Sequence, residues 1–223
     1  MIDKFVPDVA AALAGIADGA VVLLPGFGNG IPDTLMHGLV AQGARDLTVV
    51  LNSGGRDTGP TADLLASGHV RKLICSYVRP DSIAGRLFAA GKLELEIVPQ
   101  GTLAERLRAA GAGIPAFYTQ TAADTVLAEG RETRLINGRN CLLEYPLRGD
   151  VALIDAWEAD RWGNLTHRES ARNYNPIMAM AADLTIVQTT HAVPLGAIAP
   201  ANVHTPGVFV HRVVHVPAEG PVP

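Results

Sequence analysis

A glutamine at the end of a predicted strand is the first candidate for chemistry in this chain. Gln100 stands in the sequence V-P-Q-G-T-L, which follows the alternating segment 93–97. The residues that follow predict a helix start, with Thr102 as N-cap and Glu105 completing a capping box. Gln100 would then lie beside the free N–H groups of a helix, at the edge where open α/β sheets bind ligands. We therefore expect a binding site around Gln100.

A glycine-rich loop is the second candidate. Residues 25–32 read P-G-F-G-N-G-I-P and lie between the apolar run 20–24 and a helix predicted to begin near Asp33. Three glycines in such a place let the backbone pass close to a ligand and point N–H groups at an anion. The spacing matches neither a dinucleotide-binding nor a P-loop fingerprint. Taken alone, the loop is equally compatible with a tight turn.

Patterns for covalent catalysis and metal binding are missing from the sequence. It contains no G-x-S-x-G, H-E-x-x-H or C-x-x-C motif. His211 and His215 would share a strand face, but two histidines make an incomplete zinc site, so we expect no metal. Cys75 and Cys141 are expected to be buried and reduced. The sequence thus offers hydrogen-bond donors and glycine loops but no nucleophile.

The remaining polar candidates have simpler interpretations. His167 and His191 are expected at the surface. Arg168 and Arg172 are four residues apart and would share one face of a helix. Paired guanidinium groups there could hold a carboxylate or a phosphate, or could form a solvated helix face.

The elements that must position these residues alternate along the chain. Helices are predicted in segments 8–17, 60–67, 80–90 and 176–182, in addition to those after residues 32 and 101. Strands are predicted in segments 20–24, 47–51, 70–76, 93–98, 151–155 and 184–188. Short links between strands and helices indicate an α/β fold, with a single open, mainly parallel sheet and helices on both faces. The pair Asn137-Gly138 predicts a hairpin, and the absence of any linker or repeat predicts one domain over residues 1–223.

Composition narrows the class of protein. Hydrophobic residues make up 48% of the 223 residues and charged residues 18%, and the formal net charge is -4. This balance argues against a nucleic-acid-binding protein, which would need a basic stripe. No apolar run reaches the roughly 18 residues of a membrane helix, and the N-terminus lacks a signal-peptide pattern. We therefore expect a cytoplasmic protein with no membrane association.

Several stretches together resemble one family. They are the glycine loop at 25–32, V-P-Q-G-T-L-A-E-R at 98–106, G-A-G-I-P-A-F-Y-T at 111–119, D-R-W-G-N-L-T at 160–166, A-R-N-Y-N-P-I-M-A-M-A-A at 171–182 and H-T-P-G-V-F-V at 204–210. In this order, over nearly the whole chain, they are similar to the A subunits of the two-subunit 3-oxoacid CoA-transferases. Two departures occur. The family loop begins G-G-F and is longer, whereas Pro25 stands here at the first glycine, and Ser53 replaces the second of two paired asparagines.

The resemblance implies a ping-pong transfer of CoA. A glutamate supplied by a partner B subunit would attack the donor acyl-CoA and become a glutamyl-CoA thioester, from which an acceptor carboxylate takes the CoA. This chain lacks the family's S-E-N-G motif, so it would supply half of the site in a heterodimer or heterotetramer. The CoA thioester is a substrate, and no permanently bound cofactor is implied. Succinyl-CoA is the expected donor, and the segments D-R-W-G-N-L-T and F-V-H-R-V-V favour 3-oxoadipate as acceptor over acetoacetate.

The resemblance also implies roles for individual residues. The expected substrate and oxyanion-binding residues are Gln100, Asn52, Ser53, Phe117 and Tyr118, with the two aromatic rings excluding water. The expected CoA or acyl loop residues are Gly26, Phe27, Gly28 and Gly30. Two further hypotheses are a catalytically inactive protein that binds CoA esters and, on fold likeness alone, a sugar-phosphate isomerase.

Overall fold

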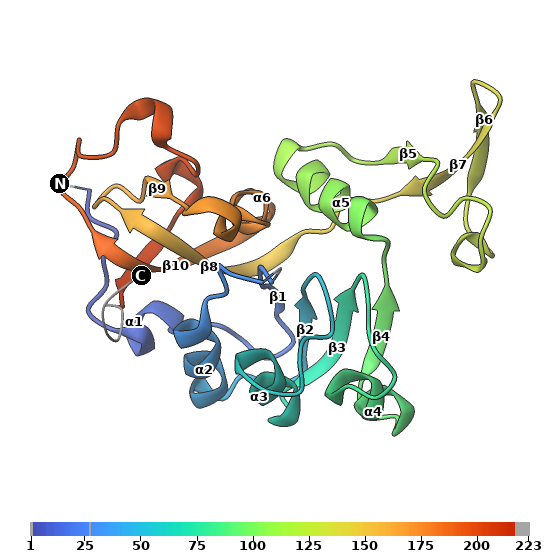
Figure 1. Ribbon diagram of the computed structural model, residues 1–223, viewed down its shortest axis with the longest axis horizontal. Helices are drawn as coiled ribbons and strands as arrows, with labels where there is room; N and C mark the ends of the chain where they lie inside the picture. Colours follow the sequence, from blue (N-terminus) through green and yellow to red (C-terminus); the bar gives the residue numbers. More distant parts are fainter. Residues whose placement is uncertain (1, 27, 217–223) are drawn as a thin grey trace.

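A parallel sheet forms the centre of the protein (Figure 1). The computed structural model describes residues 2–26 and 28–216. Within them the sheet has eight strands in the order β11-β10-β8-β1-β2-β3-β4, with β9 added to β8. Every pair along this order is parallel, and only the β8–β9 pair is antiparallel. The predicted mainly parallel α/β sheet is confirmed.

The helices and strands have the following bounds. The helices are α1 (Val9–Leu13), α2 (Asp33–Gln42), α3 (Pro60–Ala66), α4 (Ile83–Ala89), α5 (Gln100–Ala112) and α6 (Asn175–Ala181). The strands are β1 (Val21–Leu23), β2 (Leu47–Val50), β3 (Val70–Cys75), β4 (Glu94–Ile97), β5 (Phe117–Thr119), β6 (Thr133–Ile136), β7 (Arg139–Glu144), β8 (Gly149–Ala159), β9 (Leu165–Thr166), β10 (Ala182–Ala192) and β11 (Arg212–His215). None of the described helices is long and apolar enough to cross a membrane.

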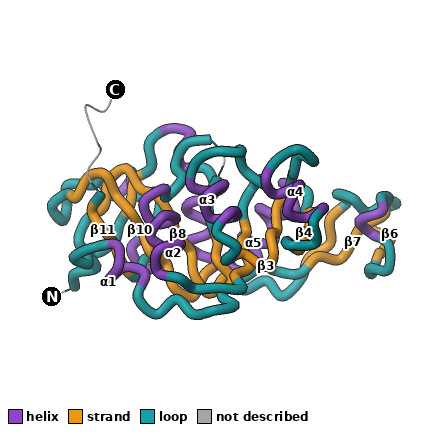
Figure 2. The backbone as a smooth tube through the Cα atoms, turned by 90° about the horizontal axis from the view of Figure 1, so that it is seen from below, coloured by secondary structure: helices purple, strands orange, loops and turns teal. Residues whose placement is uncertain are grey.

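The two faces of the sheet carry separate hydrophobic cores. Side chains alternate between the faces along each strand, so Val49 joins the core under α1–α4 and Val50 joins the core under α5 and α6. Figure 1 shows α5 and α6 on one side of the strands, and Figure 2, seen from below, shows α1–α4 on the other. Because each central strand is covered on both faces, its sequence is a continuous apolar run. This is why the strands could be predicted.

The start of α5 differs from the prediction. Leu103 N donates to Pro99 O over 2.8 Å, so the first helical turn already includes Gln100 and the N-cap is Pro99. Thr102 therefore lies inside the helix and is buried, where it caps nothing. Glu105 pairs with Arg108 instead of closing a capping box. The helix is capped at its C-terminus by Gly113, which takes the left-handed conformation that glycine favours.

A second, antiparallel sheet stands apart from the first. It has three strands in the order β5-β7-β6 and projects beyond α5 in Figure 1. The predicted hairpin is present: Asn137 and Gly138 join β6 to β7 with φ of 50° and 75°, as a type I′ turn requires. The mainly parallel sheet is thus supplemented by a small sheet that the sequence pattern predicted only as a hairpin.

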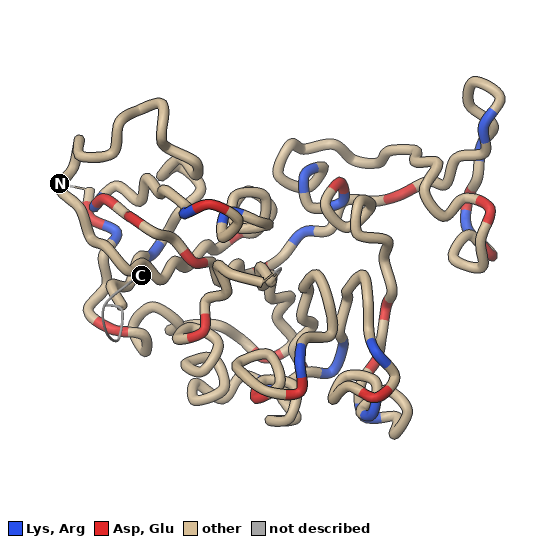
Figure 3. Tube along the Cα trace, viewed as in Figure 1, with Lys and Arg blue, Asp and Glu red and all other residues tan. Residues whose placement is uncertain are grey.

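Ion pairs tie the small sheet to the edge of the large one. Buried Glu144 of β7 lies 2.9 Å from Arg131 and 4.0 Å from Arg106 of α5. Arg106 also contacts Glu96 of β4, and Glu96 contacts Lys72 of β3 over 2.6 Å. Elsewhere acidic and basic residues are interspersed along the described trace (Figure 3).

Candidate functional site

Four successive strands of the sheet end around one depression. The chain runs from β1 outward through β2, β3 and β4, whereas β8 flanks β1 on its other side, so β1 marks the switch point at which such sheets bind ligands. A depression of about 430 Å³ lies there. The described residues that line it are Gly26, Gly28, Asn52, Ser53, Ser76, Tyr77 and Gln100. The structure therefore brings Gln100, Asn52, Ser53 and part of the glycine loop together at the predicted edge of the sheet.

Gln100 and Asn52 form a pair of amides at the bottom of this depression. Gln100 Nε2 donates to Asn52 Oδ1 over 2.9 Å, and the hydroxyl of Tyr174 donates to the same oxygen over 3.3 Å. With Oδ1 of Asn52 occupied by two donors, its Nδ2 group and the second N–H of Gln100 are left to donate elsewhere. Gln100 is exposed, while Asn52 is buried. The pair can therefore present N–H groups to a polarised carbonyl oxygen.

A tyrosine holds this pair from below. Tyr174 is buried and lies just before α6, so its ring packs in the core under α5 and α6. Its hydroxyl also lies 3.5 Å from the Gln100 carbonyl oxygen. Burial raises the pKa of the Tyr174 hydroxyl, which is therefore protonated and a donor at neutral pH. Sequence reasoning gave Tyr174 no role of its own and missed its contact with the amide pair.

The asparagines that flank Tyr174 hold the glycine loop. Asn173 Nδ2 donates to Asn29 O over 2.7 Å, and Asn175 Nδ2 donates to Gly30 O over 3.1 Å. The segment N-Y-N thus fixes both the glycine loop and the amide pair. Gly30 itself has φ of 71°, and a Cβ built there would lie 2.2 Å from the carbonyl oxygen of Ala171. Only glycine fits at this position.

A buried polar cluster supports the same loop from the β8 side. Asp155 N donates to Asn175 Oδ1 over 2.8 Å, and Asp155 Oδ1 accepts from Gln188 Nε2 over 3.0 Å. Gln188 Oε1 in turn accepts the free N–H groups of Thr34 and Leu35 in the first turn of α2. Burial, with Asp33 nearby, raises the pKa of Asp155 to about 7. The signal for these residues was a polar residue ending each apolar run, V-A-L-I-D and L-T-I-V-Q.

Both predicted aromatic side chains lie away from the depression. Phe117 and Tyr118 belong to β5, which pairs with β7 in the small sheet. The hydroxyl of Tyr118 donates to Glu132, and Arg134 lies 5.0 Å from the centre of the Tyr118 ring. Neither of them is among the described residues that line the depression. The expectation that these rings exclude water at the Gln100 site is therefore not met by the geometry of this chain.

The two histidines expected at the surface lie deeper than predicted. His167 is buried: its ring nitrogens contact Asp155 O and Thr205 Oγ1, and burial lowers its pKa to about 4, so it is neutral. His191 is half-buried, and its ring meets the Trp157 ring edge-on with 4.3 Å between the centres. Both rings therefore support the structure around β8 and lie outside the depression.

Two further predictions concern the arginine pair and the glycine loop. The segment forms a 3-10 turn, Glu169–Arg172, rather than an α-helix; Arg168 immediately precedes the turn and Arg172 is its last residue. Arg168 lies 4.9 Å from the centre of the Trp157 ring. Phe27, which was expected in the CoA or acyl loop, lies outside the described residues.

The cysteines are not poised for chemistry. Cys75 and Cys141 are free and buried, as predicted. Burial raises the pKa of the Cys75 thiol to about 11, so it is not a thiolate at neutral pH. The part of the chain that the structure describes contains no group of three or more His, Cys, Asp or Glu side chains able to hold a metal ion.

Comparison with known proteins places this chain in a family. The family model described as Coenzyme A transferase matches residues 6–216. The chain belongs to the coenzyme A transferase family. The resemblance predicted from the sequence motifs is thereby confirmed.

Curated relatives of this CoA-transferase chain are named for two different CoA-transferase activities. It is 51% identical to the A subunit of 3-oxoadipate CoA-transferase from Pseudomonas putida, over 97% of this chain and 95% of the relative. It is 50% identical to the A subunit of succinyl-CoA:3-ketoacid coenzyme A transferase from Xanthomonas campestris, over 93% of this chain and 86% of the relative. The solved glutaconate coenzyme A-transferase of Acidaminococcus fermentans has the same fold, with a TM-score of 0.83 at 22% identity, covering 96% of this chain and 76% of that one.

Proposed function

We propose that this chain is the A subunit of a CoA-transferase that moves CoA from succinyl-CoA to a 3-oxo acid, with 3-oxoadipate as the acceptor. Relatives that are 51% and 50% identical to this chain have names that support 3-oxoadipate and other 3-oxo acids, respectively, as acceptors. The segments D-R-W-G-N-L-T and F-V-H-R-V-V favour 3-oxoadipate. Acetoacetate is the alternative acceptor.

The amide pair carries this proposal. Gln100 and Asn52 place N–H donors at the carboxyl ends of the strands, and no carboxylate, cysteine or lysine is among the described residues that line the depression. Such a surface can bind a developing oxyanion, and its serine and tyrosine hydroxyls have no basic side chain among the described lining residues to activate them as nucleophiles. It fits one half of a shared site, in which the attacking glutamate belongs to the partner.

The transfer consists of two half-reactions, one with the CoA donor and one with the acceptor. The partner's carboxylate attacks the thioester carbonyl of succinyl-CoA, which expels CoA thiolate and leaves a mixed anhydride. The thiolate then attacks the glutamyl carbonyl, releasing succinate and forming the enzyme thioester. The acceptor carboxylate repeats these steps in reverse, so no external acid, base or oxidant is consumed. In each attack, negative charge develops on a carbonyl oxygen, where N–H groups of Gln100 and Asn52 would stabilise it.

A partner must also cover the depression. Gln100 is exposed, and Tyr77 beside it is 61% exposed. A thioester or anhydride must be protected from water, and neither Phe117 nor Tyr118 lines the depression. The B subunit would therefore supply both the nucleophile and the closure of the site.

A CoA-exchange assay tests the proposal. The chain alone and the complex with its B subunit would be given succinyl-CoA and either 3-oxoadipate or acetoacetate. We expect no exchange from the chain alone and rapid exchange from the complex, with a higher kcat/KM for 3-oxoadipate. Exchange only with acetoacetate would move the proposal to the alternative acceptor. A folded complex that binds CoA esters without exchange would support an inactive binding protein and contradict the proposal.

A further inference from the structure

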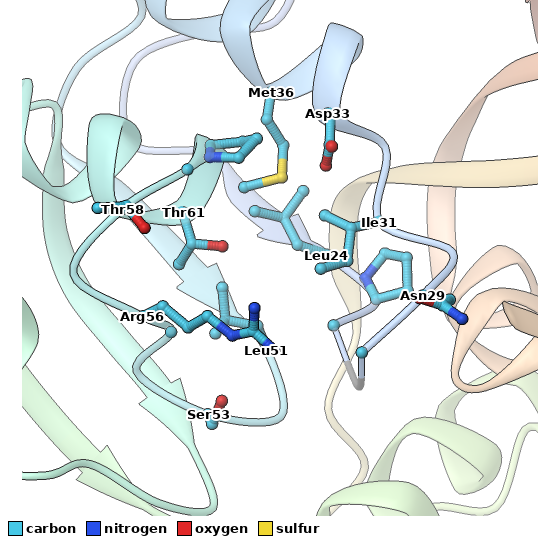
Figure 4. A pocket seen from close by; sticks show the side chains of 16 residues that line it. Leu24, Asn29, Ile31, Asp33, Met36, Leu51, Ser53, Arg56, Thr58 and Thr61 are labelled. Atoms are coloured by element: carbon cyan, nitrogen blue, oxygen red, sulfur yellow. The ribbon is translucent and has the colours of Figure 1, made fainter. Parts of the chain in front are cut away.

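A second cavity adjoins the depression that contains the amide pair. It has a volume of about 460 Å³ and lies between the loops that follow β1 and β2 and the starts of α2 and α3 (Figure 4). Gly26, Gly28 and Ser53 line both spaces. A ligand whose reacting carbonyl lies at Gln100 could therefore extend past Ser53 into the second cavity.

The lining of this cavity is divided between apolar and polar groups. The apolar side chains include Leu24, Ile31, Met36 and Leu51. The polar lining includes Thr58 and Thr61, and Figure 4 shows the Thr61 hydroxyl directed into the cavity. Methylene groups fit the apolar wall, and a charged end group would need a partner of opposite sign.

Arg56 provides that charge. It lines the cavity, and Figure 4 shows its side chain extending between Thr61 and Ser53 with the guanidinium group toward Leu51. Over the described residues, no hydrogen bond or ion pair joins the Arg56 guanidinium to another side chain. A guanidinium group can bind both oxygens of a carboxylate at once.

The neighbouring acids leave Arg56 available to a ligand. Asp57, the next residue, lies 3.4 Å from Arg86 and 3.8 Å from Arg79, and it accepts from Ile83 N over 2.7 Å. Asp33 is the only acid among the described lining residues, and Figure 4 shows it across the cavity from Arg56.

The loop that carries Arg56 is fixed by its neighbour Gly55. Gly55 has φ of 76°, and a Cβ built there would lie 2.6 Å from the Thr61 side chain. A side chain at this position would therefore be strained and would push the loop away from α3. The close approach holds the base of Arg56 beside the cavity.

We propose that Arg56 binds the terminal carboxylate of a dicarboxylic acyl group whose reacting carbonyl lies at the Gln100–Asn52 pair. This inference rests on the proposed CoA transfer and deepens it, because it names the substrate class that the site selects. Succinyl and 3-oxoadipyl groups end in such a carboxylate, whereas an acetoacetyl group does not. Arg56 is then a specificity-determining residue of the acyl site.

The test compares acyl donors in the complex with the B subunit. Formation of the enzyme-bound CoA thioester would be followed by mass spectrometry after mixing with succinyl-CoA or acetoacetyl-CoA over a range of concentrations. The variants are Arg56→Gln, Arg56→Lys and a control, Arg45→Gln. Arg45 is also exposed, but it precedes β2, at the strand end opposite to the cavity.

Arg56→Gln should raise the half-saturating concentration of succinyl-CoA by about 10- to 100-fold, as expected for the loss of a charge-assisted hydrogen bond. The half-saturating concentration of acetoacetyl-CoA should change by less than about twofold, because its acyl group has no terminal carboxylate for Arg56 to bind. Arg56→Lys, which keeps the charge, should recover part of the effect, and Arg45→Gln should match the wild type.

Failure of the Arg56 inference can be distinguished from failure of the proposed CoA transfer. An equal effect of Arg56→Gln on both donors would mean that Arg56 contacts the CoA moiety, and no effect on either would mean that it contacts no substrate; each result overturns the inference while leaving CoA transfer intact. If the wild-type complex forms no thioester with any donor, the proposed function fails, and the inference fails with it.

Discussion

Gln100 is exposed and Asn52 is buried, and their side-chain amides are joined by one hydrogen bond. Their remaining N–H groups are left to donate to a ligand in the depression. Asn52 Oδ1 accepts from Gln100 and Tyr174, which orients the Asn52 amide with its N–H groups outward. A side chain held by two donors loses less freedom when substrate binds, so its contribution to the transition state is greater.

Gln100→Ala should lower kcat of the complex by about 100-fold, since removing one well-placed oxyanion donor costs on the order of 3 kcal/mol of barrier. Steady-state exchange with succinyl-CoA measures this change. Gln120→Ala is the matched control, because Gln120 is exposed and its side chain bonds Arg139 of the small sheet. Equal activity of the Gln100 and Gln120 variants would remove Gln100 from the oxyanion site.

Tyr174→Phe should lower kcat about fivefold with little change in KM, because one hydrogen bond worth about 1 kcal/mol is lost from the amide pair. Steady-state exchange again measures the change. If Tyr174 acts through Asn52, the same substitution should have little further effect in an Asn52→Ala background. A fivefold loss that persists in that background would show that Tyr174 acts by another route.

At the scale of elements, the turn before α6 makes the contacts that hold the parts of the site together. It contacts the glycine loop through Asn173 and Asn175 and the amide pair through Tyr174. These contacts join residues separated by 144, 145 and 122 positions in the chain. Local sequence patterns carry no record of such contacts, which is why these contacts could not be predicted from the sequence.

Gly30→Ala tests the close approach of the loop to this turn. The added Cβ would lie 2.2 Å from Ala171 O, on a backbone with φ of 71°. We expect a loss of free energy of unfolding larger than the roughly 1–2 kcal/mol of left-handed backbone strain alone. Gly43→Ala gives that reference, since Gly43 has φ of 92° and nothing within 4 Å of an added methyl group. Urea unfolding of the two variants measures the difference, and equal losses would exclude a role for the contact.

The Asp155 cluster predicts how stability depends on pH. The pKa of Asp155 is about 7 in the folded protein and about 3.9 in an unfolded chain. Between these values the folded state holds a proton that the unfolded state releases, so this group's contribution to stability falls as pH rises from about 4 to about 7.

Asp155→Asn should remove that pH dependence. From pH 5 to pH 8, the wild-type chain should lose on the order of 2 kcal/mol more unfolding free energy than the variant. Urea titrations of both proteins at the two pH values measure the difference. Parallel losses in wild type and variant would show that Asp155 titrates near its ordinary pKa.

At the scale of the whole molecule, the sequence predicted the sheet better than the site. Central strands are buried on both faces and read as apolar runs, and Asn137-Gly138 has the φ values that a tight hairpin turn demands. The capping box at Thr102 failed because Pro99 already begins the helix. Phe117 and Tyr118 were placed by motif alone, and the structure puts them in the small sheet, where they do not line the depression.

Under the proposed function, the chain as a whole provides a half-site. Its depression has oriented N–H donors, a neighbouring cavity with a cationic side chain, and no carboxylate among the described lining residues of the first space. Under the proposed function, the nucleophile and the cover over the depression would come from the B subunit.

The most direct test of this half-site locates the covalent intermediate. The complex would be incubated with succinyl-CoA, quenched in acid, and its two chains weighed separately by intact mass spectrometry. We predict the added mass of CoA on the B subunit, with none on this chain. A CoA adduct on this chain would contradict the half-site, because it would show that the nucleophile lies here.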